Sequence, residues 1–121
     1  MHPIEYQAMR KALGLSVKDI AWRFDKAVRT AQRWETYNEP PNDVQEWILE
    51  KWTGFTTLAG VAIAEARELD ARGEVLGLPV YESEDECIAE MGLDYSEQAA
   101  LYGHIILLCS MEDLPYRIDE V

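Results

Sequence analysis

The stretch SVKDIAWRFDKAVRTAQRWE, from Ser16 to Glu35, decides how the first part of the chain folds. Ser16 and Asp19 have the spacing of a capping box, which supplies acceptors to the free N–H groups at a helix start. The apolar residues that follow recur at the i, i+3, i+4 and i+7 spacing of one helical face, at Val17, Ile20, Ala21 and Phe24. A helix is therefore predicted to run from Ser16 to about Arg23.

A second apolar face follows a break near Asp25, and its expected inward side chains are Ala27, Ala31 and Trp34. That helix must end before Pro40-Pro41, because proline cannot continue a helix and restricts the residue before it. An earlier helical face starts at Ile4 and is closed by Gly14. Three short helices with a tight break between the second and third predict a helix-turn-helix.

The polar side chains of the third helix point outward if Ala31 and Trp34 point inward. Arginine can pair bidentately with guanine and glutamine with adenine, and threonine can contact thymine. Basic residues on the preceding helix and in the turn suit phosphate oxygens. These arguments predict contacts to double-stranded DNA from Lys18, Arg23, Lys26, Arg29, Thr30, Gln32 and Arg33. The alternative is that these side chains only form a solvated helix face.

The charge of the chain is divided unequally. The formal net charge is −12, yet residues 1–33 hold seven basic and three acidic side chains. Residues 73–121 hold twelve acidic side chains and one basic side chain, Arg117. Such an asymmetry suggests different partners for the two ends of the chain, whereas the plainer alternative is that the acidic half only maintains solubility.

The segments "MRKALGLSVKDIAWRF", "RTAQRWE" and "PP" resemble the lambda-repressor-like (Cro/XRE) helix-turn-helix domain. The matching positions are the small Ala21, the pair Trp34-Glu35 and the prolines after it. Through "IEYQAMR" and "DYSEQAALYGHIILL", the chain also looks like the Aca/YdiL-like subgroup of small bacterial or phage regulators, which includes anti-CRISPR-associated repressors. The resemblance implies an ion pair between Arg10 and Glu35.

The chain departs from this family in the turn, where the family usually has glycine followed by an aliphatic residue. Asp25-Lys26 stands there instead, so the start of the third helix can shift by a residue or two. Val28 is then the candidate for the aliphatic place, and it joins the predicted DNA-binding residues.

Beyond Pro41 the apolar spacing of three and four continues almost to Gly73, as one helix or as two helices divided at Thr53-Gly54. Residues 74–81 and 116–118 are candidates for a short two-stranded β element. Asp94 and Glu97 open a last helix whose Ile105–Cys109 segment is apolar on every side, so it must be buried. A subunit interface is predicted at Leu101, Tyr102, Ile105, Leu108 and Cys109, the alternative being packing within one chain.

The sequence carries no pattern of an enzyme, a metal site or a cofactor site. The histidines, His2 and His104, form no zinc motif, and the glycines are scattered singly. The first residues lack the apolar core of a signal peptide, and the longest apolar run, at 105–109, is too short to span a bilayer. With Cys87 and Cys109 far apart, we expect a cytoplasmic protein with no membrane partner.

The prediction is a mainly α protein that regulates transcription. A helix-turn-helix domain of four to five helices at 1–52 precedes a helical dimerisation region at 53–121. The expected activity is that of a homodimeric repressor that reads an inverted repeat, with no small-molecule effector indicated. The rival hypothesis is an antitoxin-like or adaptor protein that keeps the helix-turn-helix as a scaffold. An acidic mimic of DNA is disfavoured because the basic residues are clustered.

Overall fold

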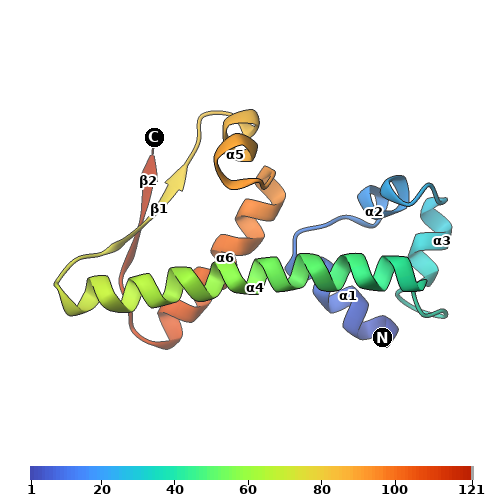
Figure 1. The fold of residues 1–121 in the computed structure, drawn as a ribbon, viewed down its shortest axis with the longest axis horizontal. Coiled ribbons are helices and arrows are strands. Elements are labelled where there is room, and N and C mark those ends of the chain that lie inside the picture. Colours follow the sequence, from blue (N-terminus) through green and yellow to red (C-terminus); the bar gives the residue numbers. More distant parts are fainter. Residues whose placement is uncertain (121) are drawn as a thin grey trace. The chain divides into compact units, whose positions relative to one another are not determined.

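The computed structural model describes residues 1–120 and divides the chain into two compact units, Met1–Phe55 and Thr56–Val121. Within the described residues, six helices and two strands form, which confirms the predicted mainly α fold with a short β element (Figure 1). In chain order they are α1 (Pro3–Ala12), α2 (Val17–Arg23), α3 (Val28–Arg33), α4 (Asn42–Ala71), β1 (Leu76–Val80), α5 (Glu84–Met91), α6 (Tyr95–Met111) and β2 (Tyr116–Glu120).

The first unit contains the predicted helix-turn-helix. The Ser16 side chain accepts a hydrogen bond from the Asp19 N–H over 3.0 Å, so the predicted cap of α2 is confirmed. The apolar faces of α1, α2, α3 and the first part of α4 meet in one core. Its buried side chains are Tyr6, Leu13, Ile20, Ala21, Ala31, Trp34, Val44, Ile48 and Phe55.

The turn between α2 and α3 is built around Asp25, whose φ of 52° is left-handed. The N–H of the next residue, Lys26, bonds to the Ala21 carbonyl over 2.9 Å and closes α2. Aspartate tolerates this conformation better than most residues.

The predicted inward position of Ala27 is wrong. Ala27 has an extended backbone, is exposed and forms the N-cap of α3. Because the chain reverses direction at Asp25, residues 25–27 form the turn and α3 begins only at Val28. The next residue, Val28, is 41% exposed in the first turn of α3, so it lies on the surface and does not fill a buried place in the turn.

Helix α4 is one continuous helix of 30 residues, without a division at Thr53-Gly54. A helical glycine with open space around it is tolerated because neighbouring turns keep their hydrogen bonds. The first unit contains α4 up to Phe55, and the second contains the rest. The buried residues of this second part, Ala59, Ile63 and Ala66, follow helical spacing.

In the second unit, β1 and β2 form a two-stranded parallel sheet, which confirms the predicted β element. Leu76 lies opposite Tyr116, and Leu78 lies opposite Ile118. Helix α6 begins with a complete capping box formed by Asp94 and Glu97, as the sequence predicted.

The apolar helix α6 is packed within its own chain along one side. Leu101, Ile105 and Cys109 are buried, Tyr102 and Leu108 are partly buried, and both cysteines of the chain are free thiols. The first three therefore belong to the core of one chain, which was the alternative to a subunit interface. Leu107 and Met111, at 56% and 72% exposure, are the most exposed large apolar side chains of this helix. In the part of the chain that the structure describes, no helix has the length and apolar character needed to cross a membrane.

The left-handed turn generates a prediction about stability. Asp25→Val should lower the free energy of unfolding by about 1–2 kcal/mol, because a β-branched side chain resists positive φ. Asp25→Gly, the matched control, should retain the stability of the wild type. Urea unfolding followed by circular dichroism measures both. If the two variants unfolded at the same urea concentration, the turn would not depend on backbone conformation at this residue.

Candidate nucleic-acid interface

Helix α3 is held in place by two apolar side chains. It has only six residues, and Ala31 and the C-cap residue Trp34 are buried against the first unit's core. A helix this short is unstable in isolation, so its position depends on tertiary packing. Trp34 is a core residue, as predicted, and it is unavailable for stacking on a base.

An ion pair links α1 to the residue that follows this helix segment. Arg10 Nε and Nη2 donate to the two carboxylate oxygens of Glu35 over 2.7 and 3.0 Å. Arg10 Nη1 also donates to the Leu15 carbonyl over 2.9 Å. The Arg10 and Glu35 side chains are only 12% and 6% exposed. This bidentate pair confirms the contact that the family resemblance implied.

Tyr6 lies in the same environment. Burial, reinforced by the Glu35 carboxylate, raises the pKa of Tyr6 to about 12, although the Arg10 guanidinium acts in the opposite direction. The phenol therefore stays neutral at physiological pH. The Arg10–Glu35 pair thus lies among buried, uncharged neighbours, where an unpaired charge would be costly.

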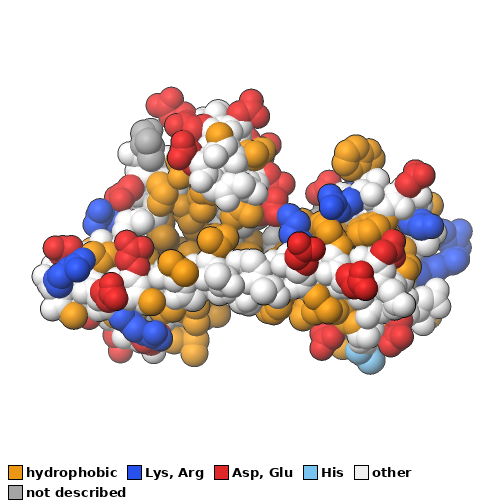
Figure 2. All heavy atoms as spheres, in the orientation of Figure 1, with side chains coloured by type: hydrophobic (Ala, Val, Ile, Leu, Met, Phe, Trp, Pro, Cys, Tyr) orange, Lys and Arg blue, Asp and Glu red, His pale blue; other side chains and the backbone are white. Residues whose placement is uncertain are grey.

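The outward face of α3 carries the predicted DNA-reading side chains. Arg29, Thr30, Gln32 and Arg33 are all exposed. Figure 2 shows Lys and Arg side chains gathered over α2 and α3. Within residues 1–120, no carboxylate forms an ion pair with Arg29 or Arg33. Their guanidinium groups can therefore bind an external acceptor without breaking an internal contact.

The predicted phosphate contacts differ from one another in their surroundings. Lys18 and Lys26 are exposed, and neither is ion-paired within the described chain. Arg23 is exposed too, but its guanidinium carbon lies 4.9 Å from the centre of the Trp47 ring on α4. This cation–π contact restricts the Arg23 side chain, whereas neither Lys18 nor Lys26 has such a contact within the described residues.

The structure adds Thr36 and Tyr37 to this surface, two residues that the sequence analysis did not name. The N–H groups of Thr36 and Tyr37 bond to the Arg33 carbonyl over 3.2 and 3.0 Å, so the turn after α3 stays beside it. An open depression of about 310 Å³ is lined by Arg29, Gln32, Arg33, Thr36 and Tyr37. Trp22 and Tyr37 are each 86% exposed. The exposure of Trp22 could have been predicted from the sequence, because Trp22 lies off the apolar stripe of α2.

The polar groups of this surface are hydrogen-bond donors and acceptors. Its members carry guanidinium, ammonium, amide and hydroxyl groups, and the Tyr37 ring borders the depression. Among residues 1–120, no three His, Cys, Asp or Glu side chains gather in a way that could hold a metal ion. No protein-family model matches the chain, and the comparison with curated proteins gives no significant match.

The Arg10–Glu35 pair generates a prediction about stability. Glu35→Ala leaves a buried guanidinium without its partner, so the free energy of unfolding should fall by about 3 kcal/mol. The matched control is the double variant Arg10→Met with Glu35→Leu, which removes both charges and should lose clearly less. Urea unfolding of the three proteins measures the difference. If Glu35→Ala were as stable as the double variant, the pair would not be what holds α3 to α1.

Proposed function

We propose that this protein is a sequence-specific DNA-binding transcription regulator that acts as a homodimeric repressor. It binds double-stranded DNA in the cytoplasm and acts by occupying a promoter, without catalysing a reaction. The observation that carries the proposal is the exposed face of α3. Two unpaired arginines, a glutamine and a threonine project there from a helix that is fixed by buried contacts on its other side.

The groups of this face match the edges of bases in the major groove. A guanidinium presents two parallel donors to O6 and N7 of guanine, and an amide presents a donor and an acceptor to N6 and N7 of adenine. Arg29, Gln32 and Arg33 line one depression, so neighbouring base pairs can be read together. The exposed ring of Tyr37 borders the same depression and can pack against sugar or base.

The lysines of the first unit supply contacts without sequence preference. Lys18 lies on α2 and Lys26 in the turn before α3, and such residues commonly bind phosphates on either side of a recognition helix. The acidic segment 73–121 repels the DNA backbone. This repulsion lowers non-specific affinity and leaves discrimination to the short basic face.

Two copies are proposed because one recognition helix contacts little DNA. A single small module buries too little surface for a tight operator complex. A two-fold dimer presents two such helices to half-sites about 34 Å apart, one DNA turn. The operator is therefore proposed to be an inverted repeat.

The rival function is a module that binds another protein. The exposed ring of Trp22 favours it, because large exposed aromatic residues are common in protein interfaces. In this alternative, the first unit is an antitoxin-like or adaptor scaffold, and the basic residues are only a solvated face. The wild type would then bind DNA only weakly and without sequence preference, and removing Arg29 or Arg33 would not change this.

The deciding experiment selects bound sequences from random DNA and then measures affinities of variants by fluorescence anisotropy. Arg29→Ala and Arg33→Ala should each lose about 1–3 kcal/mol of binding free energy, with preference relaxed at one base position. Lys18→Ala should weaken binding evenly across sequences. The matched control is Arg72→Ala, which removes the same charge from the surface of the second unit and should bind like the wild type. Wild-type affinity and selectivity in both α3 variants would rule out this recognition face.

The same complexes should respond strongly to salt. Each phosphate neutralised by the protein releases counterions, so the logarithm of the affinity should fall with a slope of about −0.9 per contact. Lys18→Ala should reduce that slope by about one contact, because it removes a phosphate ligand and leaves base readout intact. Titrations at several potassium chloride concentrations give the slopes. Affinity that did not change with salt would favour the protein-binding alternative.

A further inference from the structure

The sheet of the second unit has two edges that pair with no further strand among residues 1–120. Side chains of α6 cover part of the β1 edge, whereas the β2 edge is open. β1 and β2 pair with each other and with no third strand in the described chain. Unpaired strand edges attract further strands, so proteins usually cover or block them. The two edges of this sheet differ in how they are treated.

The free edge of β1 is blocked. Pro79 has no N–H to donate, and its carbonyl accepts hydrogen bonds from Tyr102 Oη over 2.6 Å and from Gln98 Nε2 over 3.3 Å. Just beyond the strand, the Tyr81 carbonyl accepts from Tyr95 Oη over 3.0 Å. Side chains of α6 therefore occupy the Pro79 and Tyr81 carbonyls, and the proline removes one donor from this edge.

The free edge of β2 is open. The Pro79 carbonyl points away from β2, so the alternate residues Leu76 and Leu78 turn their backbone groups toward it. In the parallel register, their partners Tyr116 and Ile118 then present N–H and C=O groups to the outer edge. Ile118 is 50% exposed although its partner Leu78 is buried.

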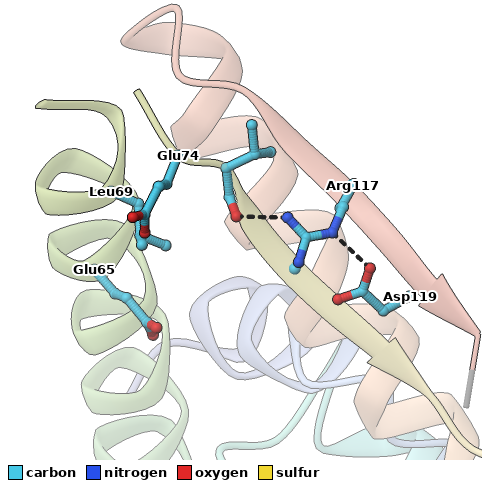
Figure 3. A pocket seen from close by; sticks show the side chains of 7 residues that line it. Glu65, Leu69, Glu74, Arg117 and Asp119 are labelled. Atoms are coloured by element: carbon cyan, nitrogen blue, oxygen red, sulfur yellow. Dashed lines mark hydrogen bonds and ion pairs between the residues drawn. The ribbon is translucent and has the colours of Figure 1, made fainter. Parts of the chain in front are cut away.

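The other face of β2 carries two opposite charges in a fixed arrangement (Figure 3). Arg117 Nε donates to Asp119 Oδ1 over 2.7 Å, and Arg117 Nη1 donates to the Val75 carbonyl over 2.9 Å. Both side chains lie over Gly77, where a Cβ atom would collide with the Asp119 carboxylate. The absence of a side chain at Gly77 thus leaves room for the Asp119 carboxylate and the Arg117 guanidinium.

We propose that β2 pairs antiparallel with β2 of a second copy of this chain, about a two-fold axis through Ile118. The resulting sheet has four strands, with β1 of each copy on the outside. In this register Arg117 faces the partner's Asp119, Ile118 faces the partner's Ile118, and Tyr116 faces the partner's Glu120. Each strand offers the outward backbone groups of Tyr116, Ile118 and Glu120 to the other.

The charge pattern identifies the occupant as a second copy. The sequence Tyr-Arg-Ile-Asp-Glu at 116–120 places opposite charges at directly opposed positions when it pairs antiparallel with itself about Ile118. In-register parallel pairing would place arginine on arginine and aspartate on aspartate, which is unfavourable. Two-fold pairing of identical patches is also the commonest form of homodimer. The inference rests on the proposed function for the need of two copies, and it names the surface that joins them.

The test uses two single variants of the full-length chain. Arg117→Asp makes the strand doubly acidic, and Asp119→Arg makes it doubly basic. Each variant alone should dimerise at least about tenfold more weakly than the wild type, because like charges face each other twice across the axis. An equimolar mixture should form heterodimers, since an acidic strand then faces a basic one. Sedimentation velocity gives the association state, and native mass spectrometry distinguishes heterodimers from homodimers.

The mixture separates pairing between chains from stability within one chain. Both variants lack the internal Arg117–Asp119 ion pair, so recovery on mixing can come only from the partner's strand. Ile118→Pro is an independent variant: it removes an N–H that points away from β1, and it should be monomeric with an unchanged circular dichroism spectrum. Leu107→Asp is the control on the exposed side of α6, and it should remain dimeric.

Three results would overturn the proposal: a wild-type chain that stays monomeric at all concentrations, a mixture that stays as monomeric as its components, or a dimer lost in Leu107→Asp and retained in Ile118→Pro. DNA binding is read separately on a duplex holding a single half-site. There the β2 variants should bind like the wild type, so failure of strand pairing with intact half-site binding leaves the proposed DNA recognition standing. If Arg29→Ala loses half-site binding while the β2 variants retain it, the result bears on DNA recognition and not on strand pairing.

Discussion

The bidentate contact between Arg10 and Glu35 is the constraint on which the geometry of the first unit depends. Six residues of helix cannot maintain their own orientation in water, so α3 takes its position from what surrounds it. Ala31 and Trp34 provide apolar burial, which is non-directional. The ion pair adds direction, because two parallel hydrogen bonds fix both the distance and the angle between α1 and the end of α3. Burying these two charges costs desolvation free energy, and the pair formed fixes the orientation of α3 relative to α1.

That constraint also determines which side chains are free to bind. Once Trp34 is directed inward and Glu35 is committed to Arg10, the arginines on the opposite side of α3 have no carboxylate partner within the described residues. The contrast with Arg117 is instructive, because that arginine is held by Asp119 and a backbone carbonyl. An acidic protein with unpaired cations on one helix face keeps them available by placing its carboxylates elsewhere. The net charge of −12 is therefore a poor guide to the local chemistry of α3.

Much of this could be predicted from the sequence, where local chemistry alone decides the outcome. The Ser16 and Asp94 caps and the β pairing of 74–81 with 116–118 required only short patterns. The Arg10–Glu35 contact spans 25 residues, and only the family resemblance indicated it. Ala27 was misplaced because apolar spacing does not reveal a left-handed residue at Asp25. The buried side of α6 could not be predicted for another reason. Because apolar residues lie on every side of this helix, their spacing does not show which side faces the core. Whether its own chain or a second copy covers Leu101, Ile105 and Cys109 is then decided by packing alone.

The pairing proposed at the open edge of β2 and the DNA binding proposed at the basic face of α3 have opposite electrostatic requirements. Two copies of a chain with charge −12 repel each other at long range, so self-association needs directional contacts that act only at short range. Backbone hydrogen bonds along a strand have that property, and they are insensitive to the net charge of the partners. The proposed DNA binding reverses the balance, because it would rely on attraction between phosphates and a few cations. Salt screens both the repulsion between two copies of the chain and the attraction between its cations and phosphates. Added salt therefore favours the proposed strand pairing and weakens the proposed DNA binding.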